Sequence, residues 1–132
     1  MTHVLLAVDD DNERAERQAE RVASLDWDSD AIRATVLHVF TENIEGATIG
    51  RFGPARKARD TLEDAGIDIE LAESSGEPGV EIVEFAKEVD ADLISVAGRN
   101  RTPAGKAVFG SVAQTVMLDS ELPVLFSGSG GQ

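Results

Sequence analysis

The chain has 132 residues, no cysteine and a formal net charge of -13, from 25 acidic and 12 basic residues. This length fits one domain with a single core, and the absence of cysteine excludes disulfides, thiolate metal sites and cysteine nucleophiles. The negative charge argues against binding to nucleic acid or to anionic membranes, and no apolar run reaches the length of a membrane span. We therefore expect a cytoplasmic protein of one domain, residues 1–132, in which residues 128–132 form a flexible Gly/Ser tail.

The first part of the chain begins with a continuous apolar run over residues 3–9, typical of a strand buried on both faces. No basic segment precedes this run, so a signal peptide is not expected. A polar turn follows, in which Asp11 or Asn12 can cap a helix. Residues 31–40 predict a second strand, and His38 within it is expected to be a packed core residue rather than a ligand.

In the middle of the chain, residues 41–53 show no clear period and predict a loop. Pro54 suits the first turn of a helix that Gly66 would end. Residues 67–71 alternate apolar and polar side chains, as expected for a strand at a sheet edge. A turn over residues 74–78 leads to a third helix. Its expected apolar face comprises Val80, Ile82, Val83, Ala86 and Val89.

The last part predicts a fourth strand over residues 92–98, a helix over residues 110–119 and a short fifth strand over residues 123–127. Strands that alternate with helices through short links imply right-handed crossovers and a doubly wound parallel α/β sheet. The alternating third strand belongs at an edge and the apolar first and fourth strands in the centre. The consistent order is 3-2-1-4-5, and ligands are expected beyond the carboxyl ends of strands one and four.

A basic loop between the fourth strand and the fourth helix stands out in this acidic chain. No acid occurs over residues 93–118, although Arg99, Arg101 and Lys106 do. The loop leads to a helix start at Gly110, and a helix N-terminus presents unpaired N–H groups and a partial positive charge that favour phosphate. We predict an anion site here; the alternative is a loop whose charges are simply solvated.

The order of elements, the length and three motifs together resemble the universal stress protein family over nearly the whole chain. The matching segments are residues 5–9 (Leu-Leu-Ala-Val-Asp), residues 37–39 (Leu-His-Val), and Gly98 with residues 110–113 (Gly-Ser-Val-Ala). The resemblance implies an adenine nucleotide, ATP alone or with Mg²⁺, at the carboxyl ends of strands one, two and four. No flavin is expected.

By this resemblance, Asp9 contacts the ribose, Val39 lines the adenine pocket and Gly98 allows close approach of the nucleotide. The residues from Gly110 onwards hold phosphates through backbone N–H groups and a serine hydroxyl. The predicted nucleotide site comprises Ala7, Val8, Asp9, Val39, Gly98, Arg99, Arg101, Gly110, Ser111 and Val112.

This chain departs from the family motif G-x-x-G-x9-G-[ST] in its basic loop. Arg101 stands where the second glycine belongs, and the span from Gly98 to Gly110 is one residue short. Arg101 could give charge-assisted hydrogen bonds to a phosphate, or it could block the pocket.

Catalysis is not expected beyond slow ATP hydrolysis or autophosphorylation, because a Ser-His-Asp arrangement would require Ser111, His38 and Asp9 to converge. The acids at residues 9–11 could hold Mg²⁺ together with nucleotide oxygens. The preferred interpretation of these acids is one helix cap plus solvated charge, so we predict no metal site of the protein's own.

The resemblance also implies a homodimer through the last strand, where Val124–Phe126 would otherwise be an exposed apolar edge. We expect a stress-responsive regulatory dimer with an unknown protein partner. The abundance of acids and the scarcity of lysine further suggest a halophilic archaeon, although an ordinary acidic mesophilic protein is the alternative. The alternative function is a family member that binds no nucleotide and acts as a dimeric interaction module.

Overall fold

A five-stranded parallel sheet organises the computed structural model, which describes residues 2–25, 31–41, 49–98 and 110–127. The strands are β1 (Thr2–Ala7), β2 (Ile32–Phe40), β3 (Asp68–Ser75), β4 (Leu93–Ala97) and β5 (Val124–Ser127). Their order is β3-β2-β1-β4-β5, with every neighbouring pair parallel. The predicted order 3-2-1-4-5 and the doubly wound α/β class are thus confirmed.

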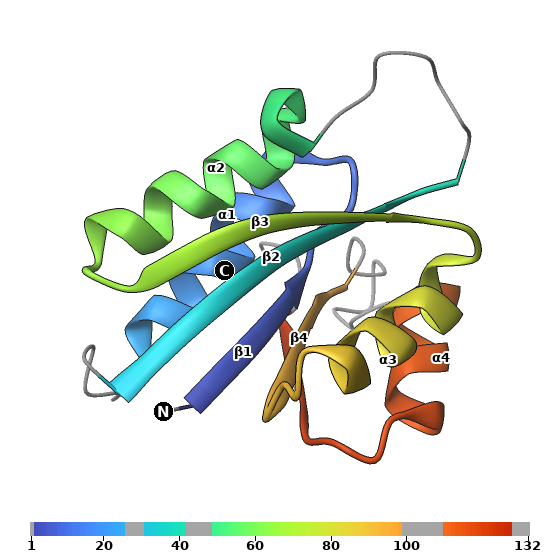
Figure 1. Ribbon diagram of the computed structural model, residues 1–132. Helices are drawn as coiled ribbons and strands as arrows, with labels where there is room; N and C mark the ends of the chain where they lie inside the picture. The colour runs from blue at the N-terminus through green and yellow to red at the C-terminus, as the bar shows by residue number, and fades with distance from the viewer. Residues whose placement is uncertain (1, 26–30, 42–48, 99–109, 128–132) are drawn as a thin grey trace, which may run out of the picture.

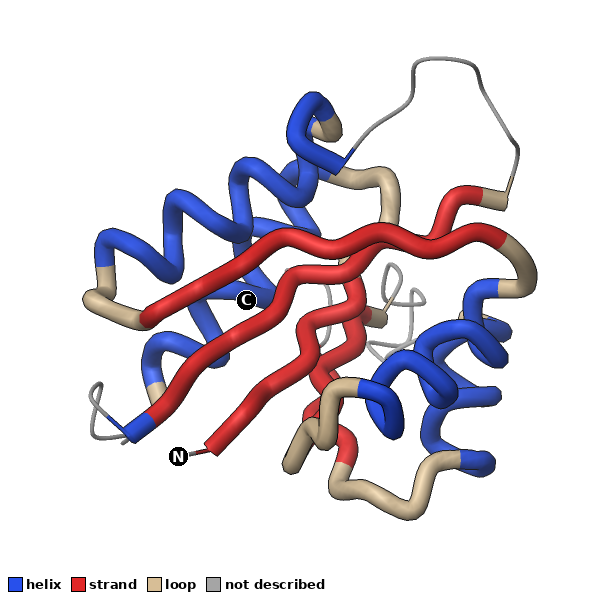
Figure 2. Tube along the Cα trace, viewed as in Figure 1, coloured by secondary structure: helices blue, strands red, loops and turns tan. Residues whose placement is uncertain are grey.

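Helices cover both faces of the sheet (Figure 1). Helices α1 (Asn12–Ser24) and α2 (Gly53–Asp64) pack on one face, and α3 (Pro78–Glu88) and α4 (Ser111–Asp119) pack on the other. A short 3₁₀ turn, η2 (Ile49–Arg51), precedes α2. Figure 2 shows the strands as a twisted layer between these two helical layers. Among the described helices, none is long and apolar enough to cross a membrane.

The central strand β1 explains why the first apolar run has no alternation. Val4 and Leu6 pack toward α1 and α2, whereas Leu5 and Ala7 pack toward α3 and α4. Because successive side chains of a strand point to opposite faces, a strand covered on both sides needs apolar residues at every position. The two cores therefore meet at β1.

Local signals at two helix ends have the predicted roles. The Asp11 carboxylate accepts a hydrogen bond from the Arg14 N–H at 2.9 Å, which caps α1. Gly66 follows α2 with φ +81°, a left-handed conformation that glycine adopts without a steric penalty, and its N–H donates to the Glu63 carbonyl.

Two predictions about the middle of the chain are wrong. The segment expected as a turn, residues 74–78, is partly strand, because β2 extends to Phe40 and pairs with β3 as far as Ser75. Only two residues then separate β3 from α3. Val80 is 39% exposed instead of facing the core. It lies about 100° around the helix from Gly79, which packs against Thr115 of α4.

Candidate functional site

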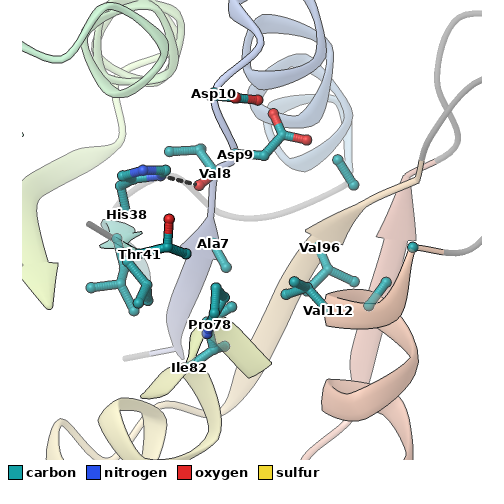
Figure 3. Close-up of a pocket in the computed structure, with 15 residues that line it drawn as sticks. Ala7, Val8, Asp9, Asp10, His38, Thr41, Pro78, Ile82, Val96 and Val112 are labelled. Atoms are coloured by element: carbon teal, nitrogen blue, oxygen red, sulfur yellow. Dashed lines mark hydrogen bonds between the residues drawn. The ribbon is translucent and has the colours of Figure 1, made fainter. Parts of the chain in front are cut away.

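A cavity of about 290 Å³ lies at the carboxyl ends of β1, β2 and β4 (Figure 3). This is the point at which the winding of the sheet reverses, where doubly wound sheets bind their ligands. Its described lining comprises Ala7, Val8, Asp9, Asp10, Leu37, His38, Val39, Thr41, Pro78, Ile82, Val96, Ala97, Gly110, Val112 and Ala113. The volume is near the lower end of the range of small-molecule sites, about 300 Å³.

The cavity has an apolar wall and a polar side. Val39, Ile82 and Val96 contribute aliphatic surface from three different elements, which suits a flat apolar group such as a base. Asp9 and Asp10 lie on the opposite side from Ile82, in the turn that follows β1 (Figure 3). The lining can therefore accept a ligand that is apolar at one end and carries hydroxyl groups near the other.

The N-terminus of α4 opens onto the cavity. Gly110 precedes the helix in an extended conformation, and no side chain of the described residues caps the helix start. Gly110, Val112 and Ala113 line the cavity, whereas Ser111 is exposed and is not part of the described lining. The first N–H groups of a helix have no intrahelical partner and carry a partial positive charge, so this end of the cavity favours an anion.

Asp9 is held from two directions. Its Oδ1 accepts a hydrogen bond from the Asp11 N–H at 3.0 Å, and its Oδ2 accepts one from Arg14 Nε at 2.8 Å. Partial burial alone would lower the pKa of the Arg14 guanidinium, but the hydrogen bond to Asp9 and the charges of Asp9, Asp11 and Asp10 outweigh it, and the pKa lies above its ordinary value. The guanidinium is thus a permanent cation beside the acidic turn.

The arrangement of the acidic side chains and of His38 tests the possibility of a metal site and of a Ser-His-Asp catalytic site. Within the described ranges, no group of three or more acidic or histidine side chains is arranged to hold a metal ion. His38 directs Nδ1 at the Val8 carbonyl, 2.8 Å away, and its ring stacks on Phe52 with centroids 4.0 Å apart. Since a carbonyl only accepts, Nδ1 carries the proton. His38 is packed and hydrogen-bonded and does not pair with Asp9, but it is half-buried and lines the cavity, so its expected absence from the ligand site stays a prediction.

The predicted site residues are distributed as follows. Those that line the cavity are Ala7, Val8, Asp9, Val39, Gly110 and Val112. Gly98 lies beside β5: its N–H donates to the Ser127 carbonyl at 2.7 Å, and a Cβ there would come within 2.2 Å of Phe126 Cζ. Arg99 and Arg101, like the tail at 128–132, fall outside the described residues.

The predicted nucleotide site lacks Gln18, Arg14 and nine residues that line the cavity, which are Asp10, Leu37, His38, Thr41, Pro78, Ile82, Val96, Ala97 and Ala113. Ile82 had been placed only in a core face, although it lines the cavity. Gln18 is fully buried, and its Nε2 donates to the carbonyls of Ala7 and Ser95 at 3.1 and 2.9 Å, which ties α1 to β1 and β4 at the switch point. The available signal was Ser95, the polar residue within an otherwise apolar strand. Arg14 had no assigned role.

Comparison with known proteins gives consistent matches. Residues 1–127 match the Universal stress protein family. A universal stress protein of Mycolicibacterium smegmatis is 34% identical over 80 residues, which are 60% of this chain and 62% of that protein. The chain thus spans less than two thirds of that relative.

Two solved structures share the whole architecture. A universal stress protein in complex with cAMP matches with a TM-score of 0.73 at 25% identity, over 98% of this chain and 98% of that one. The universal stress protein of Archaeoglobus fulgidus in complex with dAMP matches with a TM-score of 0.69 at 26% identity, over 96% of this chain and 97% of that one.

Proposed function

The chain belongs to the universal stress protein family, and from this we propose that it is a cytoplasmic stress-response protein that binds an adenine nucleotide in the cavity between β1 and β4. The observation that carries the proposal is the meeting, in one cavity, of an apolar wall and a helix N-terminus that no described side chain caps. The first feature suits a base and the second suits a phosphate. The cAMP and dAMP complexes of two similar proteins support this class of ligand.

Different residues of the cavity would contact different parts of the nucleotide. Val39, Ile82 and Val96 would contact the base, and Asp9 would accept hydrogen bonds from sugar hydroxyl groups. The N–H groups at the start of α4 would hold the phosphate nearest the sugar. We propose ATP as the ligand, and any Mg²⁺ would be bound mainly by its phosphates, because Arg14 already pairs with Asp9.

A sharp test removes one backbone donor at the phosphate end. Ser111→Pro deletes an N–H at the first position of α4, where proline is well tolerated, and Gly110 already has the extended conformation that a following proline requires. We expect AMP affinity to fall about tenfold, in line with loss of a hydrogen bond to a charged group, and adenosine affinity to stay unchanged. Calorimetric titration measures both.

Ser111→Ala is the matched control, because it removes the hydroxyl and keeps the N–H. Equal losses for AMP and adenosine in Ser111→Pro would show that the α4 N-terminus does not bind the phosphate.

The second candidate function, an interaction module without nucleotide, is favoured by Arg101 in place of the motif glycine. In that case wild-type protein would bind neither ligand.

The proposal includes a homodimer and a cytoplasm of high salt concentration. A homodimer through β5 would extend the sheet at its outermost described strand, and the dimer would present the nucleotide-bound state to an unidentified protein partner. The net charge of -13 supports a working environment of high salt, such as the cytoplasm of a halophilic archaeon, where self-repulsion is screened.

A further inference from the structure

Arg14 projects from the first turn of α1 over the acidic turn formed by Asp9, Asp10 and Asp11. Its Nε lies 2.8 Å from Asp9 Oδ2, its Nη1 lies 3.7 Å from Asp11 Oδ2 and its Nη2 lies 4.0 Å from Asp10 Oδ1. The Arg14 side chain is 20% exposed, against 40% for Asp9 and 85% for Asp10. One comparatively sheltered guanidinium thus faces three carboxylates.

The strongest of these contacts falls on the carboxylate that lines the cavity. Asp9 uses one oxygen for Arg14 and the other for the Asp11 N–H. A carboxylate has about four acceptor positions, so each Asp9 oxygen keeps one for a ligand. Asp10 is nearly fully exposed and only 4.0 Å from the guanidinium, a pair whose attraction water screens. The Arg14–Asp9 contact therefore does more to fix geometry than the other two.

We propose that Arg14 is a positioning residue for ligand binding: it holds the ionised Asp9 carboxylate in a fixed orientation at the cavity wall and offsets the negative charge of the turn. A guanidinium suits this role because Nε and the two Nη groups form a planar fork with fixed directions. The expected ligand carries both hydroxyl groups and an anionic group. Asp9 would accept hydrogen bonds from the hydroxyl groups, and the positive charge of Arg14 would reduce the repulsion between the acidic turn and the anion. This inference rests on the proposed nucleotide site.

A double-mutant cycle tests whether Arg14 acts through Asp9. AMP is titrated into wild type, Arg14→Ala, Asp9→Asn and the double variant. We expect Arg14→Ala to raise the Kd about tenfold in the wild-type background and less than about twofold in the Asp9→Asn background. The same tenfold loss in both backgrounds would overturn the proposal.

Two further variants separate positioning from bulk charge. Arg17→Ala removes the same charge from an exposed position on the same helix, and it should leave the Kd unchanged. Arg14→Lys keeps the charge without the planar fork, so its Kd should fall between wild type and Arg14→Ala. An Arg17→Ala loss as large as that of Arg14→Ala would mean that only net charge matters. Melting temperatures of all variants check the fold.

A ligand-free measurement keeps the inference distinct from the proposed function. The Asp11 N–H donates to Asp9 Oδ1, so its hydrogen-exchange rate reports whether Asp9 stays in place. We expect Arg14→Ala to speed exchange at Asp11 several-fold while Arg17→Ala does not. If wild type binds no AMP but Asp11 responds in this way, the nucleotide proposal fails and the positioning of Asp9 stands. Unchanged exchange in Arg14→Ala would overturn the positioning itself.

Discussion

At the residue scale, packing against Phe126 is enough to explain why position 98 is a glycine, and no ligand contact is needed for that explanation. A Cβ at this position would lie 2.2 Å from Phe126 Cζ and 2.9 Å from Phe126 Cε1. We therefore expect Gly98→Ala to lower the free energy of unfolding by about 1–3 kcal/mol, the usual cost of overpacking, as measured by urea denaturation.

Phe126→Leu supplies the matched background for this test, because it removes the ring that the new Cβ would meet. Gly98→Ala should cost much less in that background than in wild type. An equal cost in the two backgrounds would show that Phe126 does not explain the glycine.

Single residues differ in how far sequence could predict them. Gly66 was assigned correctly, and Asp11 was one of two candidate caps, because a helix cap and a helix stop depend on neighbours within a few positions. The contacts of Gln18 with Ser95 join residues 77 positions apart. No local pattern contains such a contact, because it exists only after α1 has packed across β1 and β4. Gly98 was predicted as a motif residue, but its contact with Phe126 was not.

At the element scale, β5 is the outermost strand of the described sheet on the side of β4. Pro123 and Ser127 turn their carbonyls toward β4, where they accept from the N–H groups of Ile94 and Gly98. Backbone groups alternate in direction along a strand, so those of Val124 point away from β4. Among the described strands, none pairs with β5 on this side, and a second copy of the chain is the partner we propose for Val124 there.

Val124→Pro tests that pairing. Proline removes an N–H that points away from β4, so the sheet within one protomer keeps its hydrogen bonds. We expect the dimer to dissociate at least about tenfold more readily, in line with loss of hydrogen bonding and a proline at the interface. Sedimentation equilibrium measures this, with Val124→Ala as the control. A monomeric wild type would contradict the proposed dimer.

Elements were easier to predict than their ends. The helices and β3 were recognised by apolar periods of 3.6 and 2 residues, which arise from backbone geometry alone, and β1 was recognised by a short continuous apolar run. The predicted end of β3 was wrong because the last residues of the strand, Ser74 and Ser75, are polar and typical of turns. They continue the strand since β2 offers partners as far as Phe40. Tertiary pairing outweighed local propensity at that point.

At the scale of the whole molecule, the charge of -13 sets how stability should depend on salt. Repulsion among exposed acids weakens as the screening length falls from about 10 Å at 0.1 M to about 3 Å at 1 M salt. We expect the melting temperature to rise by about 5 °C or more between 0.1 and 2 M KCl, equivalent to roughly 1 kcal/mol. A melting temperature that does not change with KCl concentration would contradict adaptation to high salt.

The strand order and the location of the cavity could be predicted from the alternation of elements, because right-handed crossovers leave few topologies for five parallel strands. The size of the cavity could not. Its volume depends on how Ile82, Val96 and Val112, from three elements, leave space between them. Side-chain packing of that kind follows from the assembled core and not from any one segment.

The measurement that tests the central claim most directly is a calorimetric titration of Mg-ATP into wild-type protein in molar KCl, after mass spectrometry has checked the preparation for bound nucleotide. We predict micromolar binding, or an adenine nucleotide already present. The absence of both binding and bound nucleotide would contradict it and leave the dimeric interaction module as the function to test.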